Sequence, residues 1–329
     1  MAEIVSREIQ FGVATEAVRG TKETTADKWL RKVVANVVER AVHAIDDTSR
    51  GRLEDGEGRR KVQSYIEGEL SGILHADVIG WFLSNIYGLV VTSTVTGSVK
   101  SHVFNLKQSI QHQSLSLFTK DGSVQQLVFS NAMINKLEIS ASVDDFVRFN
   151  ASFIASAADD NTDTPSYGTD YDFIARDITV KIADASAGLA AATALPIKDL
   201  KISWDQGLIK DHVVGAYTPD DIYNSRLLIE GSFTLNLASE TYKDLYLSNA
   251  SKYMQITIQG EADIGSGNNP TITILLNKVQ LMDWNRSGDA NALVTEPISF
   301  RAFYNASDSK QSQVTLKNLT ASYANVPSA

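Results

Sequence analysis

Hydrophobic and polar residues alternate with a period of two in several stretches of the chain. The residues of one face of the stretch 62–71 are Val62, Ser64, Ile66, Gly68 and Leu70, and those of the other are Gln63, Tyr65, Glu67, Glu69 and Ser71. The stretch 226–235 repeats this alternation around Ile229-Glu230-Gly231. Such a pattern predicts antiparallel strands with one buried and one polar face, so we expect a mainly β chain.

A short helix is expected after each of these strands. The stretch 76–87 has apolar residues at helical spacing, and Gly88 after it is suited to end a helix. The stretch 239–248 opens with Ser239, a good N-cap residue, and carries an apolar stripe of Tyr242, Leu245 and Tyr246. The pattern therefore predicts one short helix in each repeat.

The stretch 27–47 has no single interpretation from its local pattern. Trp29, Val33, Val37, Ala41 and Ile45 lie at spacings that fit an amphipathic helix. The same stretch is rich in β-branched residues, which are equally suited to strands. Helix and strand both remain open for these residues.

Four short matches recur in the same order along the chain, which indicates an internal duplication. Ile66-Glu67-Gly68 recurs as Ile229-Glu230-Gly231, and both following helices end near Ser-Asn. Asn135-Lys136-Leu137 matches Asn277-Lys278-Val279, and Phe149-Asn150-Ala151-Ser152 matches Tyr304-Asn305-Ala306-Ser307. We therefore expect a first domain at 1–157 and a second domain at 175–329.

The segment between the two expected domains, 158–174, is an acidic linker rich in Asp, Thr and Ser. It contains little that could be buried, so a solvated loop is the simplest interpretation. Asp159, Asn161, Asp163 and Asp170 have the spacing of a calcium-binding loop. Thr164 replaces the glycine that such a loop requires and no helices flank it, so calcium is a weak alternative.

Composition limits the classes of function that are possible. Of 329 residues, 43% are hydrophobic and 21% are charged, which is typical of a globular rather than a disordered chain. The formal net charge of −9 argues against a protein that grips nucleic acid through phosphates. There is no cysteine, so disulfides, thiol nucleophiles and cysteine-ligated metals are excluded. No signal peptide or membrane-spanning run is expected, which predicts a soluble protein made in a cytoplasm.

No motif for catalysis or cofactor binding is present in the sequence. The five histidines form no metal-ligand pair, and no nucleophile elbow, phosphate-binding loop or dinucleotide-binding motif follows a strand. We therefore expect neither a cofactor nor an enzymatic activity. A glycan-acting enzyme with two carboxylates is the alternative of that class, but no motif supports a particular pair.

The stretch Gly12 to Thr21 has glycine, glutamate, glycine and threonine at the spacing G-x-x-x-E-x-x-x-G-T. This opening resembles that of the major tail tube proteins of long-tailed, non-contractile phages. In that family an extended segment follows, then a charged loop, an alternating strand with a glycine, a short apolar helix and a glycine. Here 28–34, 46–61, 62–72, 76–87 and Gly88 correspond to these parts. The resemblance covers about the first 90 residues and reaches the rest through the repeat.

The resemblance implies tandem tail-tube β-sandwich domains whose inner strands join between subunits into a β-barrel around a lumen. It also implies an extended conformation around Trp29. Six tube units make a ring in this family, so a chain with two units is expected to form a trimeric ring with pseudo-sixfold symmetry. Rings would stack into the virion tail after assembly in the host cytoplasm. The implied partners are the tape-measure protein, the tail-terminator and tail-tip proteins, and double-stranded DNA that passes without specific binding.

The polar faces of the matched strands are the candidates for the lumen wall. The first set consists of Gln63, Glu67, Glu69, Ser71, Glu230, Ser232 and Thr234. The second set, which fits either lumen or subunit contact, consists of Lys136, Glu138, Lys278 and Gln280. An ordinary solvent face remains the alternative for both sets. We expect an acidic wall that repels phosphates.

Contacts between rings are expected to use the least regular segments, namely 2–25, 46–61 and 89–123. The alternative function is another virion or surface β-protein, such as a tail fibre, a decoration protein or an adhesin domain. That class would share the acidic, cysteine-free composition. It would not require a helix after each glycine-containing strand.

Overall fold

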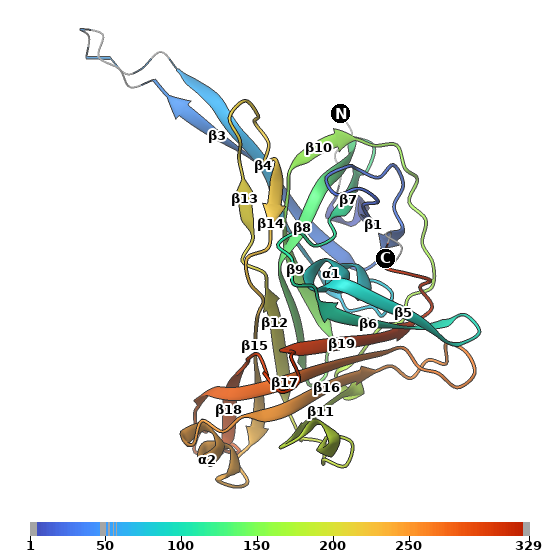
Figure 1. Ribbon diagram of the computed structural model, residues 1–329, viewed down its shortest axis with the longest axis vertical. Helices are drawn as coiled ribbons and strands as arrows, with labels where there is room; N and C mark the ends of the chain where they lie inside the picture. Colours follow the sequence, from blue (N-terminus) through green and yellow to red (C-terminus); the bar gives the residue numbers. More distant parts are fainter. Residues whose placement is uncertain (1–4, 47–50, 52, 55, 57, 325–329) are drawn as a thin grey trace.

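The computed structural model describes residues 5–46, 51, 53, 54, 56 and 58–324. The chain is mainly β, as the alternating pattern predicts, and the described residues contain two α-helices. The molecule is elongated, with a long hairpin projecting from one end and α2 at the other (Figure 1). The helices are α1 (Ile79–Tyr87) and α2 (Thr241–Leu247).

A large antiparallel sheet of eight strands runs through both halves of the chain, in the order β3-β4-β9-β8-β12-β15-β18-β17. Its strands are β3 (Val33–Ile45), β4 (Arg59–Ile73), β9 (Arg148–Ala155), β8 (Gln125–Ser142), β12 (Asp199–Asp205), β15 (Leu228–Asn236), β18 (Thr295–Ala302) and β17 (Thr271–Trp284). Leu137 on β8 pairs with Trp204 on β12, so the sheet has no break between the halves.

A second, outer sheet packs against the large one, in the order β5-β6-β19-β17-β16-β11. Its further strands are β5 (Gly88–Thr96), β6 (Val99–Leu106), β19 (Ser312–Asn318), β16 (Lys252–Gln259) and β11 (Ile178–Ala183). β17 belongs to both sheets because its first half pairs with β19 and its second half with β18. Apolar side chains of the two sheets form one continuous core.

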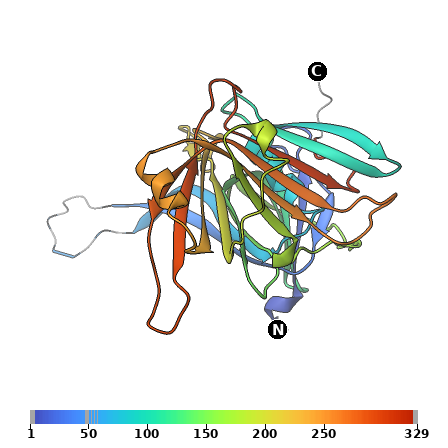
Figure 2. The ribbon, with the colours of Figure 1, turned by 90° about the horizontal axis from the view of Figure 1, so that it is seen from below.

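A smaller set of strands covers the end near the N-terminus. β1 pairs with β2 and β7, and the first half of β8 pairs with β7 and β10. These strands are β1 (Ile9–Thr15), β2 (Lys28–Leu30), β7 (Leu115–Asp121) and β10 (Ala157–Asp160). The β3–β4 hairpin and the β5–β6 hairpin leave the body on opposite sides (Figure 2).

The two helices differ in how the chain covers them. Every residue of α1 is buried, because β5, β6 and the segment around Tyr323 close over it. The rings of Trp81 and Tyr323 meet edge to face at 4.9 Å. No residue of α2 is buried, although Tyr242 packs against Phe233 of the core. The predicted ends are close to those observed, and Gly88 caps α1 with a φ of 73°.

Three segments whose conformation the sequence left open or predicted as irregular contain β-strands. The stretch around Trp29 is extended, in β2 and β3, so its β-branched residues prevail over its helical spacing. The expectation that 89–123 is irregular is wrong, because this segment supplies β5, β6 and β7. Likewise 2–25 is not a loose arm where it is described, since β1 pairs along its whole length with β7.

The arrangement of four strands in the first half recurs in the second. β3-β4-β9-β8 and β12-β15-β18-β17 have the same order, and a helix follows β4 as it follows β15. Gly68 pairs with Phe153 in the first group, and Gly231 pairs with Phe300 in the second. In both groups the phenylalanine ring lies over the glycine, where a Cβ would collide with it. The recurring Ile-Glu-Gly therefore reflects one structural requirement.

The other two sequence matches are not structurally equivalent. The bulged position of β8 is Asn135, and the corresponding bulge of β17 falls at Met282 rather than at Asn277. The counterpart of β9 is β18, which ends before Tyr304. Both matches are therefore coincidences of composition, although the order of elements that they indicated is present.

We predict that replacing Gly231 with valine lowers the free energy of unfolding by about 2 kcal/mol or more, because a side chain here must displace the Phe300 ring and the Lys201 carbonyl. Urea denaturation followed by tryptophan fluorescence measures the change. Ser232→Val, one residue along on the polar face, is the control and should stay close to wild type. Equal effects of the two substitutions would contradict the packing argument.

Candidate functional site

The polar side chains predicted from both halves lie on one face of the large sheet. A row of directly paired residues crosses seven strands and consists of Ser71, Asn150, Glu138, Ser203, Glu230, Arg301 and Gln280. Four of these residues were candidates from sequence, and they come from four different strands. The opposite face carries buried residues such as Leu137, Trp204 and Phe300. Strand pairing therefore brings the separate candidates into one surface.

The remaining candidates lie around this row. Glu67 and Glu69 precede Ser71 on the same face of β4, and Ser232 and Thr234 follow Glu230 on β15. Lys136 lies on the same face of β8, two residues before Glu138. Gln63 lies further out, on the β3–β4 hairpin beyond the end of β9, where it pairs with Val42. Lys278 lies near the point where β17 leaves the large sheet.

This face carries paired charges rather than a uniform acidic layer. Glu67 accepts a hydrogen bond from the Arg40 guanidinium at 2.5 Å. Glu138 lies 2.8 Å from the Lys201 ammonium, and Glu230 lies 3.8 Å from Arg301. Each carboxylate of these pairs has a cation beside it, so the local potential is weaker than the sequence alone indicated.

The outward face of the outer sheet has a different composition. One row across its six strands consists of Thr179, Thr257, Thr273, Thr315, Val103 and Val91. Among the described residues of these strands, no Asp or Glu points to this face. The two sheets therefore expose chemically distinct surfaces: one has charges of both signs, and the other has hydroxyl, amide and aliphatic groups with the lysines Lys181 and Lys317.

The Gly-Glu-Gly-Thr motif of the N-terminal segment has a structural explanation. The Glu16 carboxylate is buried and accepts hydrogen bonds from the backbone N–H groups of Gly20 and Asn131, at 2.7 and 2.8 Å. It also accepts from the hydroxyls of Ser114 and Ser116. Burial raises the pKa of Glu16, while these four hydrogen bonds lower it in part. Glu16 thus holds the loop after β1 onto the body.

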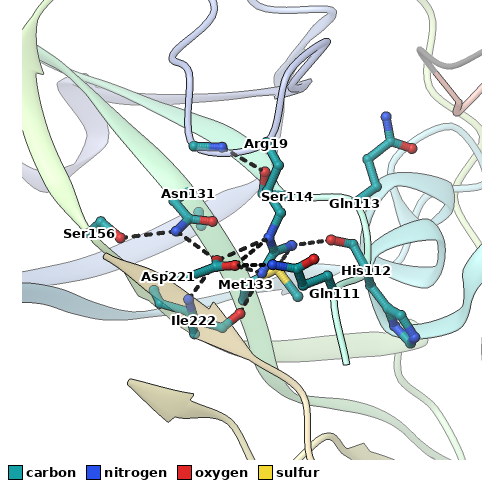
Figure 3. Close-up of polar contacts among 12 residues, drawn as sticks. Arg19, Gln111, His112, Gln113, Ser114, Asn131, Met133, Ser156, Asp221 and Ile222 are labelled. Carbon is teal, nitrogen blue, oxygen red and sulfur yellow. Dashed lines mark hydrogen bonds and ion pairs between the residues drawn. The ribbon is translucent and has the colours of Figure 1, made fainter. Parts of the chain in front are cut away.

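Arg19, one residue before Gly20, joins this loop to the second half of the chain (Figure 3). Its Nε lies 3.0 and 3.2 Å from the two carboxylate oxygens of Asp221, and its Nη2 lies 2.9 Å from one of them. Gln111 and Asn131 also donate hydrogen bonds to the same carboxylate. Burial would raise the pKa of Asp221, but hydrogen bonds from Arg19, the Ile222 backbone N–H and Gln111, together with the Arg19 charge, hold it below its usual value.

The Asp221 carboxylate holds a hairpin that the sequence did not indicate. β13 (Ile209–Asp211) and β14 (Asp221–Tyr223) form a short two-stranded hairpin beside β4. The Ser64 backbone N–H donates to the Tyr217 carbonyl at 2.7 Å, and the Lys210 ammonium lies 3.4 Å from the centre of the Tyr65 ring. Arg19 and Asp221 are 202 residues apart, so no local signal marks their contact.

The calcium candidates of the acidic segment do not converge. Asp159 lies 3.4 Å from the Lys22 ammonium, and Asp170 lies 3.0 Å from that of Lys28. Asp163 accepts hydrogen bonds from the Ala26 N–H and the Trp29 indole, and Asn161 donates to the Thr24 carbonyl. Within the described ranges, no three His, Cys, Asp or Glu side chains are grouped to hold a metal ion. The segment lies along the loop before β2 and along β2 itself.

Asp77, just before α1, is a buried carboxylate in contact with this region. Its side chain is near Lys28 and Asp170, and burial raises its pKa to about 6, with Lys28 lowering and Asp170 raising the value. A carboxyl whose pKa is higher in the folded than in the unfolded chain contributes stability at low pH, and this contribution is lost as pH rises. For Asp77 the loss falls between about pH 4 and 6.

We predict that Asp77→Asn, which cannot ionise, unfolds at a higher urea concentration than wild type at pH 7.5. The difference should be about 2–3 kcal/mol, and it should vanish near pH 4. Chemical denaturation at the two pH values measures it. A variant that is less stable than wild type by the same amount at both pH values would show that Asp77 has another structural role.

We also predict that Asp221→Asn lowers the free energy of unfolding by about 3 kcal/mol, because the Arg19 guanidinium then stays largely buried without its counter-charge. Amide hydrogen exchange should show faster exchange in the 209–223 hairpin. Glu67→Gln removes an ion pair with Arg40 on the exposed sheet face and serves as the matched control. Unchanged exchange in the hairpin would contradict the proposed anchoring.

Helices able to cross a membrane are not present in the part of the chain that the structure describes.

The chain matches a known protein family. A family model described as phage tail tube protein matches residues 6–302. This match covers the Glu16 motif, the Arg19–Asp221 contact and all eight strands of the large sheet. No curated protein matches the chain.

Proposed function

The chain belongs to the phage tail tube protein family, which makes it a structural component of the virion tail, and on that premise we propose how it builds a tube. Three copies form a ring in which the polar faces of the large sheets line a lumen. Rings stack into the conduit of a long-tailed, non-contractile phage, and DNA passes through it without specific binding. Family membership favours this role over that of a fibre, a decoration protein, an adhesin or a glycan-acting enzyme.

The observation that carries the proposal is the continuous polar face of the eight-stranded sheet. In the described part of the chain, β3 and residues 280–284 of β17 have strand partners on one side only. Exposed strand edges tend to pair with other chains unless they are covered. Pairing of β3 in one copy with the end of β17 in the next would cover both edges and close the sheets into a barrel.

The size of such a barrel supports a ring of three copies. With about 4.8 Å between strands and a tilt of about 40°, eight strands from each of three copies give a backbone diameter of about 48 Å. Side chains occupy about 5 Å at each wall, which leaves about 38 Å, wider than a DNA duplex. Two copies would leave only about 22 Å and almost no clearance. Three copies are therefore the smallest ring with a usable lumen.

The paired charges of the large-sheet face favour passage of DNA over binding of DNA. Arg40, Lys201 and Arg301 each lie beside a carboxylate, which reduces their attraction for phosphates. The carboxylates repel phosphates and favour an unattached duplex. We propose that Glu67, Glu69, Ser71, Glu230, Ser232 and Thr234 face the lumen together with Lys136 and Glu138, whereas Gln63, Lys278 and Gln280 lie close to subunit boundaries.

We further propose that the chain is a tandem duplication, with tube domains at 1–157 and 175–329 and a linker at 158–174. The recurrence of four strands and a following helix supports this division. The remaining partners are the tape-measure protein in the lumen and the tail-terminator and tail-tip proteins at the two ends. The segment 46–61, whose last three residues begin β4 and part of which lies outside the described residues, is a contact between rings.

Negative-stain microscopy of the purified chain tests the assembly directly. Three-lobed rings or tubes with a hollow centre are the expected result. Discrete monomers under all conditions, or six full chains in each ring, would overturn the proposed architecture.

Charge reversal tests the lumen face. Replacing Glu67, Glu69 and Glu230 with lysine should leave tubes intact and reduce infectivity at least tenfold, because the new cations attract the passing phosphates. The control replaces Thr179, Thr257 and Thr273 of the outer sheet with lysine, which adds cations on the opposite face. Equal infectivity of the two variants, in phage with normal tails, would exclude a lumen role for the glutamates.

A further inference from the structure

The tip of the β13–β14 hairpin exposes an apolar group that the chain itself does not cover. Val213, Val214 and Tyr217 are 43%, 107% and 60% exposed. Single exposed apolar residues are common on protein surfaces, but here three lie within five residues on one projecting turn. We call Val213, Val214 and Tyr217 the apolar tip.

The apolar tip is held in place rather than left loose. At its base, Asp221 accepts the two hydrogen bonds from the Arg19 Nε. Along its side, the Tyr217 carbonyl accepts from the Ser64 N–H of β4, and the Lys61 ammonium lies 5.4 Å from the centre of the Tyr217 ring. A contact surface that is already ordered loses less conformational entropy on binding.

An apolar cavity opens at the other end of the same molecule. It has a volume of about 630 Å³ and lies between the β8–β9 turn and the segments 174–178 and 195–200. Its apolar lining includes Val143, Phe146, Ile174, Leu195, Pro196 and Ile197. Val143 and Phe146 are 59% and 40% exposed, so the rim is apolar as well.

The separation between the apolar tip and this cavity can be obtained from the length of strand β4. Ser64, which bonds the tip, is nine residues from Ile73, and Ile73 pairs with Arg148 beside the β8–β9 turn. At about 3.3 Å per residue, the two features are about 30 Å apart along the strand. The hairpin lies toward the end from which β3 and β4 project, as Figure 1 shows.

We propose that the apolar tip of one copy inserts into the cavity of a second copy in the next ring. This inference rests on the proposed function and specifies which surfaces of the chain stack the rings. A knob and a hole on opposite ends of one chain make a head-to-tail contact, and repetition of that contact produces an open stack. The cavity lining also contains charged residues of both signs, namely Asp144, Asp145, Asp199, Arg176 and Lys198, so the proposed fit rests on the apolar side chains.

The absence of cysteine from the chain allows a clean cross-linking test. Val214→Cys and Val143→Cys place one thiol on the apolar tip and one at the cavity. Assembled protein that carries both substitutions should form, on mild oxidation, a ladder of disulfide-linked chains that extends beyond three copies. A mixture of the two single variants should give dimers only, and each single variant alone should give none.

Three results would overturn the inference. They are no cross-link in well-formed tubes, a ladder that ends at three chains, and tubes that assemble normally when Val214 and Tyr217 are both replaced with aspartate. The first and third leave the proposed function intact, because microscopy of the same samples still shows tubes. Failure of wild-type protein to form any ring or tube would instead count against the proposed function itself.

Discussion

The pairing of β8 with β12 is the interaction on which the rest of the structure depends. It joins the two groups of four strands into one sheet, and Leu137 and Ile139 on one side meet Trp204 and Ile202 on the other. The Trp204 indole N–H donates to the Tyr87 hydroxyl at 3.0 Å, and that hydroxyl lies 2.8 Å from the Ser312 hydroxyl. This buried chain of hydrogen bonds fixes α1 and β19 against the seam, so the position of the outer sheet follows from it.

Local residue patterns predicted the strands and their buried faces. Alternation of polar and apolar residues identified β4 and β15 and assigned their faces correctly, because a strand that is buried on one side must alternate. The glycine in Ile-Glu-Gly recurs because a phenylalanine ring from the neighbouring strand occupies the space that a Cβ atom would take. Which strands are neighbours could not be predicted in the same way. The contacts of Glu138 with Lys201, and of Arg19 with Asp221, join residues that are far apart in sequence.

Short sequence matches did not predict which residues are structurally equivalent in the two halves. Asn277 resembles Asn135 in its neighbours, but the bulge that Asn135 occupies corresponds to Met282. Backbone geometry sets the position of a bulge, and several side chains can occupy it. Some strand pairs cross the proposed boundary between the domains. β6 belongs to the first half but pairs with β19 of the second, so the outer sheet contains strands of both halves.

The pairing of β6 with β19 also has a consequence for how the protein is made. Ribosomes add about 5–20 residues each second. More than 200 residues separate the two strands, so β19 is synthesised about ten seconds or more after β6. During that time α1 lacks part of its cover and the edge of β6 is open. A nascent chain thus completes its core only when β19 has left the ribosome. Products of early termination would lack a finished core and could not compete with complete chains for assembly.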